Sequence, residues 1–163
     1  MRTCLIVSAT ATALVAVGGE AQPVKIPASE NVALPWTVER SHSGCQAYST
    51  TDRANSIFIE MGSDRLGTLT IMSTDFSFRD GQKLPNTSLT LGSKKFERGL
   101  AIAAGLNEVQ IGLPPPGIDA LLGVTRIKME NPGRMSFNII TDKYPIPVNR
   151  IYSCLYKRMG FPD

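Results

Sequence analysis

The chain has 163 residues, of which 42% are hydrophobic and 19% are charged, and its formal net charge is +3 at pH 7. This length suits one domain that buries its own apolar core. Because the positive excess is small and no lysine- or arginine-rich block occurs, the composition speaks against nucleic-acid binding.

The N-terminal residues have the pattern of a secretory signal peptide. Arg2 precedes an apolar, small-residue run over residues 4–19, and Gly19 and Ala21 put small residues where a signal peptidase requires them. We expect residues 1–21 to be cleaved off after Ala21, so that the mature protein is periplasmic or secreted. The run is too short and too rich in Ala, Thr and Gly to predict a membrane-spanning helix, and a first helix of the folded domain is the alternative.

The mature chain begins with a proline-rich stretch. Residues 22–35 hold three prolines and little hydrophobic periodicity, which predicts an extended leader tied down near Leu34. Trp36 opens a single β-rich domain, which we place at residues 36–163. Alternating apolar and polar residues then predict strands at 36–40, 45–50, 57–61 and 66–74.

Shorter strands and turns follow in the middle of the chain. Residues 96–105 suit either a buried strand or one to two turns of helix, because two glycines bracket their apolar run closely. Consecutive prolines at 114–116 end the strand before them, since proline cannot donate to a sheet. Alternation places these strands at 76–78, which leads into a tight turn, at 88–92 and at 108–113.

A β-hairpin and a closing helix form the end of the chain. After a helical turn at 118–122, residues 124–130 and 134–141 each alternate with period 2, so each strand has one apolar and one polar face. Pro132 followed by Gly133 suits the middle of a type II turn, because Gly accepts the positive φ there. The helix that carries Cys154 is expected to stop at Gly160.

These elements predict a mainly β fold: an antiparallel β-sandwich or a curved sheet, with a short helix and a C-terminal helix. The order of a strand pair, a short helix, another pair and a terminal helix with Cys154 resembles small secreted bacterial domains such as the invasion-associated locus B proteins. The resemblance is one of layout over residues 36–160, and it assigns a role to no residue.

Two cysteines remain after the expected cleavage, and an even count in an oxidising compartment predicts a Cys45–Cys154 disulfide. The bond would close a loop of about 110 residues and contribute roughly 4 to 5 kcal/mol in the chain-entropy model. The alternative is a nucleophilic Cys45 beside His42, the only histidine of the chain. A catalytic thiol must be exposed and must have a positioned base.

No catalytic, metal or nucleotide motif stands out in the sequence. Asp75 and Asp80 are the nearest pair of carboxylates in a turn-like context, yet their spacing does not make them converge. A single histidine would leave a zinc site almost entirely to carboxylates. We therefore predict no cofactor, no metal and no catalytic residue.

The basic residues of the hairpin form the candidate binding face. Arg126, Lys128 and Arg134 are expected to share its exposed side, where charge also deters edge pairing. Such a face suits an anionic envelope component or an acidic protein surface. We expect an exported, non-enzymatic binding domain, because no nucleophile and base occur together. A small secreted hydrolase with acidic catalytic residues is the alternative.

Overall fold

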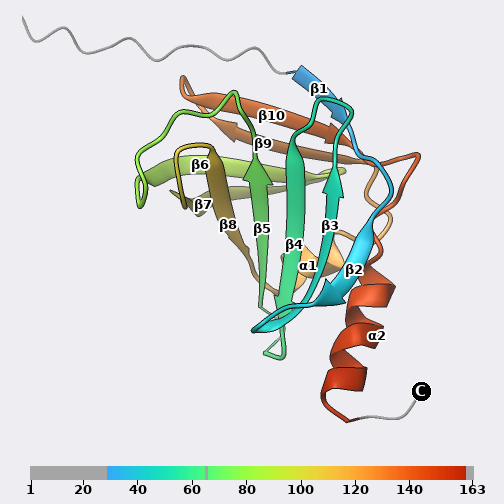
Figure 1. Cartoon of the computed structure of the whole chain (residues 1–163). Helices are drawn as coiled ribbons and strands as arrows, with labels where there is room; N and C mark the ends of the chain where they lie inside the picture. The colour runs from blue at the N-terminus through green and yellow to red at the C-terminus, as the bar shows by residue number, and fades with distance from the viewer. Residues whose placement is uncertain (1–28, 65, 161–163) are drawn as a thin grey trace, which may run out of the picture.

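The computed structural model describes residues 29–64 and 66–160. The predicted signal peptide at 1–21 and most of the leader at 22–35 lie outside the described residues. Ten strands form one curled sheet in the order β1-β10-β9-β6-β7-β8-β5-β4-β3-β2, with two helices beside it (Figure 1). The mainly β fold with a short helix and a C-terminal helix is confirmed, in its curved-sheet form.

The elements have the following bounds. The strands are β1 (Ser29–Val32), β2 (Thr37–Arg40), β3 (Gly44–Thr50), β4 (Ser56–Gly62), β5 (Gly67–Met72), β6 (Lys83–Leu91), β7 (Lys94–Ala103), β8 (Glu108–Leu113), β9 (Arg126–Asn131) and β10 (Met135–Ile140). The helices are α1 (Pro115–Asp119) and α2 (Val148–Arg158). Neighbouring strands pair antiparallel, except for β1, which pairs parallel to β10. No helix within the described ranges is long and apolar enough to cross a membrane.

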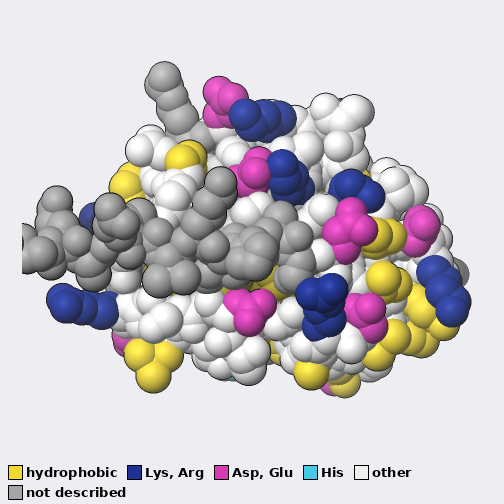
Figure 2. Space-filling model, turned by 90° about the horizontal axis from the view of Figure 1, so that it is seen from above, with side chains coloured by type: hydrophobic (Ala, Val, Ile, Leu, Met, Phe, Trp, Pro, Cys, Tyr) yellow, Lys and Arg dark blue, Asp and Glu magenta, His cyan; other side chains and the backbone are white. Residues whose placement is uncertain are grey.

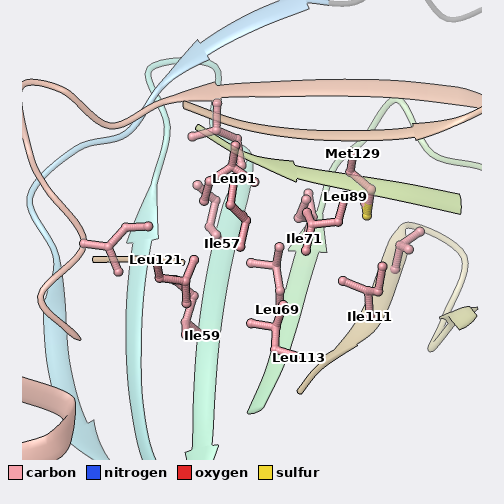
Figure 3. Packing of buried hydrophobic residues seen from close by; sticks show 14 of the residues in the cluster. Ile57, Ile59, Leu69, Ile71, Leu89, Leu91, Ile111, Leu113, Leu121 and Met129 are labelled. Carbon is pink, nitrogen blue, oxygen red and sulfur yellow. The ribbon is translucent and has the colours of Figure 1, made fainter. Parts of the chain in front are cut away.

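The period-2 alternation of the strands fills the inner side of the curl with apolar side chains. Ile59 on β4 lies opposite Leu69 on β5, which lies opposite Ile111 on β8, and all three are buried. Leu89 on β6 and Met129 on β9 face them from the opposite side of the curled sheet (Figure 3). Because the inner side is occupied by this core, polar side chains are left on the outer side.

Helix α1 and the residues after it pack against the sheet near the start of β5. Ile118 and Leu121 are completely buried there. Gly67 allows the approach, because a Cβ at this position would lie 3.1 Å from Ile118 Cδ1 and 3.1 Å from the Glu60 carbonyl oxygen. A side chain at Gly67 would require Ile118 or the β4 backbone to shift by a few tenths of an ångström.

The two edge strands of the sheet are consecutive in the chain. After β1, the backbone N–H of Ala33 donates to Ile140 O on β10 (2.9 Å), and that of Leu34 donates to Thr50 O on β3 (2.8 Å). The segment between β1 and β2 therefore bonds to the second strand from each end of the strand order, and it connects the two edges of the curled sheet. Part of the stretch that we expected as an extended leader is thus a strand of the sheet.

A buried amide network secures this join. Asn55, in the turn between β3 and β4, donates through Nδ2 to Asn31 Oδ1 on β1 at 2.6 Å, and Asn31 Nδ2 donates to the Asn138 carbonyl oxygen at 3.2 Å. Both Asn31 and Asn55 are buried. Because buried polar groups need partners, these contacts hold β1 in one register.

One predicted strand is wrong and one open choice is resolved. Phe76 and Phe78 lie in a loop, because the N–H of Phe76 donates to Ser73 O and turns the chain there. Both rings are buried, and Phe76 packs against Phe137 at 5.7 Å between centroids. Residues 96–103, for which strand and helix were open, belong to β7.

The hairpin and the terminal helix follow the sequence prediction closely. Gly133 has φ +73°, and the N–H of Arg134 donates to Asn131 O at 3.0 Å, as a type II turn requires. Helix α2 ends at Arg158, and Gly160 has the positive φ of a helix stop. The predicted inward side chains are buried: Ile127, Met129, Met135, Phe137 and Ile139.

Candidate functional site

A disulfide joins Cys45 on β3 to Cys154 on α2, with 6.1 Å between the Cα atoms and a sequence separation of 109. The predicted pairing is confirmed. Cys45 is completely buried, so in this oxidised form it is not the exposed thiolate that a nucleophile beside His42 would need.

Arg158 adds a second link between the same two elements. Its guanidinium donates to three backbone carbonyls of the turn between β2 and β3, namely Ser41 O at 2.7 Å, His42 O at 2.7 Å and Gly44 O at 2.9 Å. Arg158 lies in the last turn of α2, where a cation complements the helix dipole, and its guanidinium also holds the turn between β2 and β3. Since guanidinium presents its donors in a fixed fork, the turn and the end of α2 are held in one geometry.

The same turn bends over the outer face of β4. Ser41 Oγ donates to Glu60 Oε1 at 2.5 Å, and Ser43 Oγ donates to the same oxygen. Gly44 makes the bend possible, because a Cβ there would lie 1.9 Å from the Met61 carbonyl oxygen. A carboxylate with two hydroxyl donors is thus fixed at the rim of the sheet.

A continuous line of side chains crosses the outer face of six strands, and we call it the aromatic row. The strand register places each member opposite the next, and all of them are exposed or half-buried. Its members are Thr37, Tyr48, Phe58, Thr70, Gln110 and Ile102. The rings of Tyr48 and Phe58 stack at 5.9 Å between centroids with 28° between their planes.

Carboxylates beside the aromatic row are held by neutral donors. Gln46 Nε2 donates to Glu39 Oε1 at 2.7 Å, and Gln110 Nε2 donates to Glu108 Oε1 at 2.9 Å. With Glu60, these residues place fixed acceptors on both sides of the row. Amide and hydroxyl partners orient a carboxylate without cancelling its charge.

The predicted basic face is brought together in part. Arg126 and Lys128 lie two residues apart on the outer side of β9, but each is close to an acid: Arg126 Nη2 lies 3.4 Å from Glu30 Oε1, and Lys128 Nζ lies 2.8 Å from Glu130 Oε1. Figure 2 shows Lys and Arg beside Asp and Glu across this side of the molecule. The face therefore carries mixed charge.

Arg134 does not stand on the strand with them. It is exposed in the turn before β10, because the turn spans Asn131 to Arg134. Asn138 lies opposite Lys128 in the register, is 8% exposed, and its Oδ1 accepts no hydrogen bond from the described part of the chain. An acceptor buried beside Lys128 is a feature that charge counting on the sequence could not find.

One further ion pair lies on β7. Lys95 Nζ is 2.8 Å from Glu97 Oε1, and both side chains are largely exposed. The hydrogen bond and the charge of Lys95 lower the pKa of the Glu97 carboxyl, and the same contacts raise the pKa of Lys95.

The acids that we considered for hydrolysis remain in loops. Asp75 and Asp80 are exposed between β5 and β6, and the N–H of Asp75 donates to Ser73 Oγ at 3.2 Å. Within residues 29–64 and 66–160, no three His, Cys, Asp or Glu side chains gather as metal ligands would.

The aromatic row was missed because its members are far apart in sequence and meet only through strand register. Alternation predicted strands at 45–50 and 57–61, but it could not show that Tyr48 and Phe58 lie side by side. No protein-family model, curated protein or solved structure matches the chain.

Proposed function

We propose that this chain is the precursor of an exported, non-enzymatic domain that binds an envelope component or a partner protein in the periplasm or at the cell surface. The pattern of residues 1–21 supports export and cleavage after Ala21. The Cys45–Cys154 disulfide supports an oxidising compartment.

One observation carries the binding function. The inner side of the sheet is filled by packed apolar side chains, whereas the outer side carries ordered carboxylates, amides and rings whose positions are set by strand register. A partner therefore meets the outer side. Because sheet and disulfide hold these groups in place, binding requires little ordering of the protein.

The surface formed by Arg126, Lys128 and Arg134, which we call the hairpin face, is our candidate binding site for an anionic envelope component or an acidic protein surface. Arg134 is exposed at the tip of the hairpin, and Arg126 and Lys128 form ion pairs with Glu30 and Glu130. A partner that brings an anionic group would compete with Glu30 and Glu130 for these two cations and would meet Arg134 at the tip.

Substitution of the three cations tests the hairpin face. The variant R126Q/K128Q/R134Q of the oxidised mature domain should keep its fold, because exposed charges contribute less than about 1 kcal/mol each. It should recover less anionic envelope material, and the salt dependence of recovery should flatten.

The matched control is R53Q/R79Q/R150Q, which removes the same charge from exposed positions outside the hairpin. If both variants recover the same partners at the same salt concentration, the hairpin face is not the binding site.

The hydrolase alternative is favoured by one contact, in which Ser41 and Ser43 both donate to Glu60. If these residues act on an ester or a glycoside, Glu60→Gln should abolish turnover of a chromogenic substrate by the wild-type domain. Turnover that survives this change, or none in the wild type, removes Glu60 as a catalytic group.

A further inference from the structure

The centre of the aromatic row offers two kinds of contact at once. Tyr48 and Phe58 present half-buried rings, and Thr70 and Gln110 continue the row with a hydroxyl and an amide. A ligand that lies along the row meets apolar carbon first and hydrogen-bonding groups next. Few ligands have both surfaces repeated along their length.

The next line of outer side chains widens this surface with polar groups. Gln46 lies opposite Glu60, and Glu60 lies opposite Thr68, so an amide, a carboxylate and a hydroxyl flank the rings on one side. These groups both donate and accept hydrogen bonds. A hydroxyl-rich ligand needs such a mixture, because each hydroxyl can do the same.

The charges of this surface select against anions. Glu39, Glu60 and Glu108 stand around the row and are held by amide or hydroxyl donors. An anionic polymer would be repelled there, which separates this surface from the hairpin face and its cations. A neutral ligand is not repelled, and it can donate its hydroxyl protons to the carboxylates.

We propose that the aromatic row binds an uncharged polysaccharide, laid across β3, β4, β5 and β8. The C–H faces of the sugar rings pack on Tyr48 and Phe58, and their hydroxyls bond to Thr70, Gln110 and Glu60. This proposal rests on the proposed binding function and names the ligand class for a second surface, distinct from the hairpin face.

The test uses the oxidised mature domain and NMR titration with three neutral hexaoses: cello-, malto- and laminarihexaose. We expect one of them to shift backbone amide signals in β3, β4, β5 and β8 while the signals of β9 and β10 stay in place. Dextran sulfate is the anionic probe and should not shift the row. Polylysine is the cationic probe, and any shift that it causes should vanish at high salt.

Two variants locate the contact. Replacing both Tyr48 and Phe58 by Ser should weaken hexaose binding about tenfold or more, which corresponds to about 1.4 kcal/mol. Gln110→Met keeps the rings and the shape but removes the amide, and it should weaken binding severalfold even if the double variant does not fold. The hairpin variant R126Q/K128Q/R134Q should bind the hexaose as the wild type does.

The outcomes separate the proposals. If no neutral hexaose shifts the row, or if Gln110→Met and the ring variant bind unchanged, the polysaccharide proposal is overturned while the hairpin test stands. If polylysine alone shifts the row, its ligand is a cationic partner and the proposal fails. If the hexaose shifts β9 and β10 instead, the site is misplaced and the proposal fails in that form.

Discussion

The outer surface of the sheet has two regions that arise from the same pleat but hold their charges differently. On β9 a carboxylate and an ammonium group face each other, with Lys128 Nζ 2.8 Å from Glu130. On β8 a carboxylate of the same spacing is held by an amide, with Gln110 Nε2 2.9 Å from Glu108. The first pair cancels charge and the second retains it.

Strand alternation decides which residues face outward. Whether an outward carboxylate keeps its charge depends on the residue two positions away on the same strand, which is a cation on β9 and an amide on β8. The hairpin face, although rich in cations, is nearly balanced by Glu30 and Glu130. The region around the aromatic row has fewer charged residues but keeps its carboxylates uncancelled. A count of charged residues in the sequence would favour the hairpin face as the more strongly charged surface. The contacts instead leave more uncancelled charge around the aromatic row.

Removing the disulfide should produce the largest difference in stability between the two regions. A bond that closes 109 residues stabilises the folded state by roughly 4 kcal/mol through its effect on the unfolded chain. We expect the variant with both Cys45 and Cys154 changed to Ala to lose about that much in urea denaturation. In hydrogen exchange β2 and β3 should open before β9 and β10, because α2 is released from them. Equal opening free energies would show that the two regions unfold as one unit.

The amide network that joins the regions should give the next largest effect. Asn55→Ala removes the 2.6 Å donor of the buried Asn31 Oδ1, while Thr51 Oγ1 remains at 3.5 Å. Loss of a buried hydrogen bond costs about 1 kcal/mol. Thermal denaturation of Asn149→Ala, an exposed amide on α2, provides the control and should differ little from the wild type. A loss as small for Asn55→Ala would mean that the contact between Asn55 and Asn31 does not help to hold β1.

Two matched double-mutant cycles compare the charge pairs directly. The couplings of Lys128 with Glu130 and of Gln110 with Glu108 should each be below about 1 kcal/mol, since both pairs are partly exposed. High salt should remove most of the first coupling and little of the second, because screening acts on opposite charges. Similar salt dependence in both cycles would contradict the distinction between the two regions.

The smallest effect concerns pH and the ion pair on β7. The pKa of Glu97 is lowered by Lys95, so the stabilisation is present above the ordinary carboxyl range and is lost as pH falls through the lowered value. The raised pKa of Lys95 retains the pair until pH rises through that value. Carbon NMR titration should give Glu97 a lower midpoint than in the variant Lys95→Gln. The same Glu97 midpoint in both proteins would show that Lys95 does not stabilise the charged carboxylate.

Most of the sheet was predictable because the side-chain period of a strand is written directly in the sequence. Residues 57–61 and 108–113 alternate cleanly, and both became strands with the expected inner face buried. The type II turn at Pro132 and Gly133 and the stop at Gly160 were equally local, since each depends on one positive φ. The disulfide followed from the count of cysteines.

The parts that were missed depend on contacts between distant residues. Strand β1 has no apolar alternation, and its register comes from a parallel partner more than 100 residues away and from Asn31. Phe76 and Phe78 have the spacing of a strand, but Ser73 turns the chain and packing buries both rings. Arg134 left the hairpin face because the turn extends one residue further than alternation suggested.

The position of the disulfide also determines how the molecule would bear a mechanical load. When a pull on the two ends of the described chain unfolds the domain, the covalent path runs from Cys45 directly to Cys154. The residues between them are therefore not extended. This stretch has a sequence separation of 109 and at full extension would add on the order of 370 Å. It includes nearly all of the aromatic row and the whole hairpin. Force spectroscopy should show this length only after reduction, because in the oxidised protein a pull on the two ends cannot stretch the strands inside the loop.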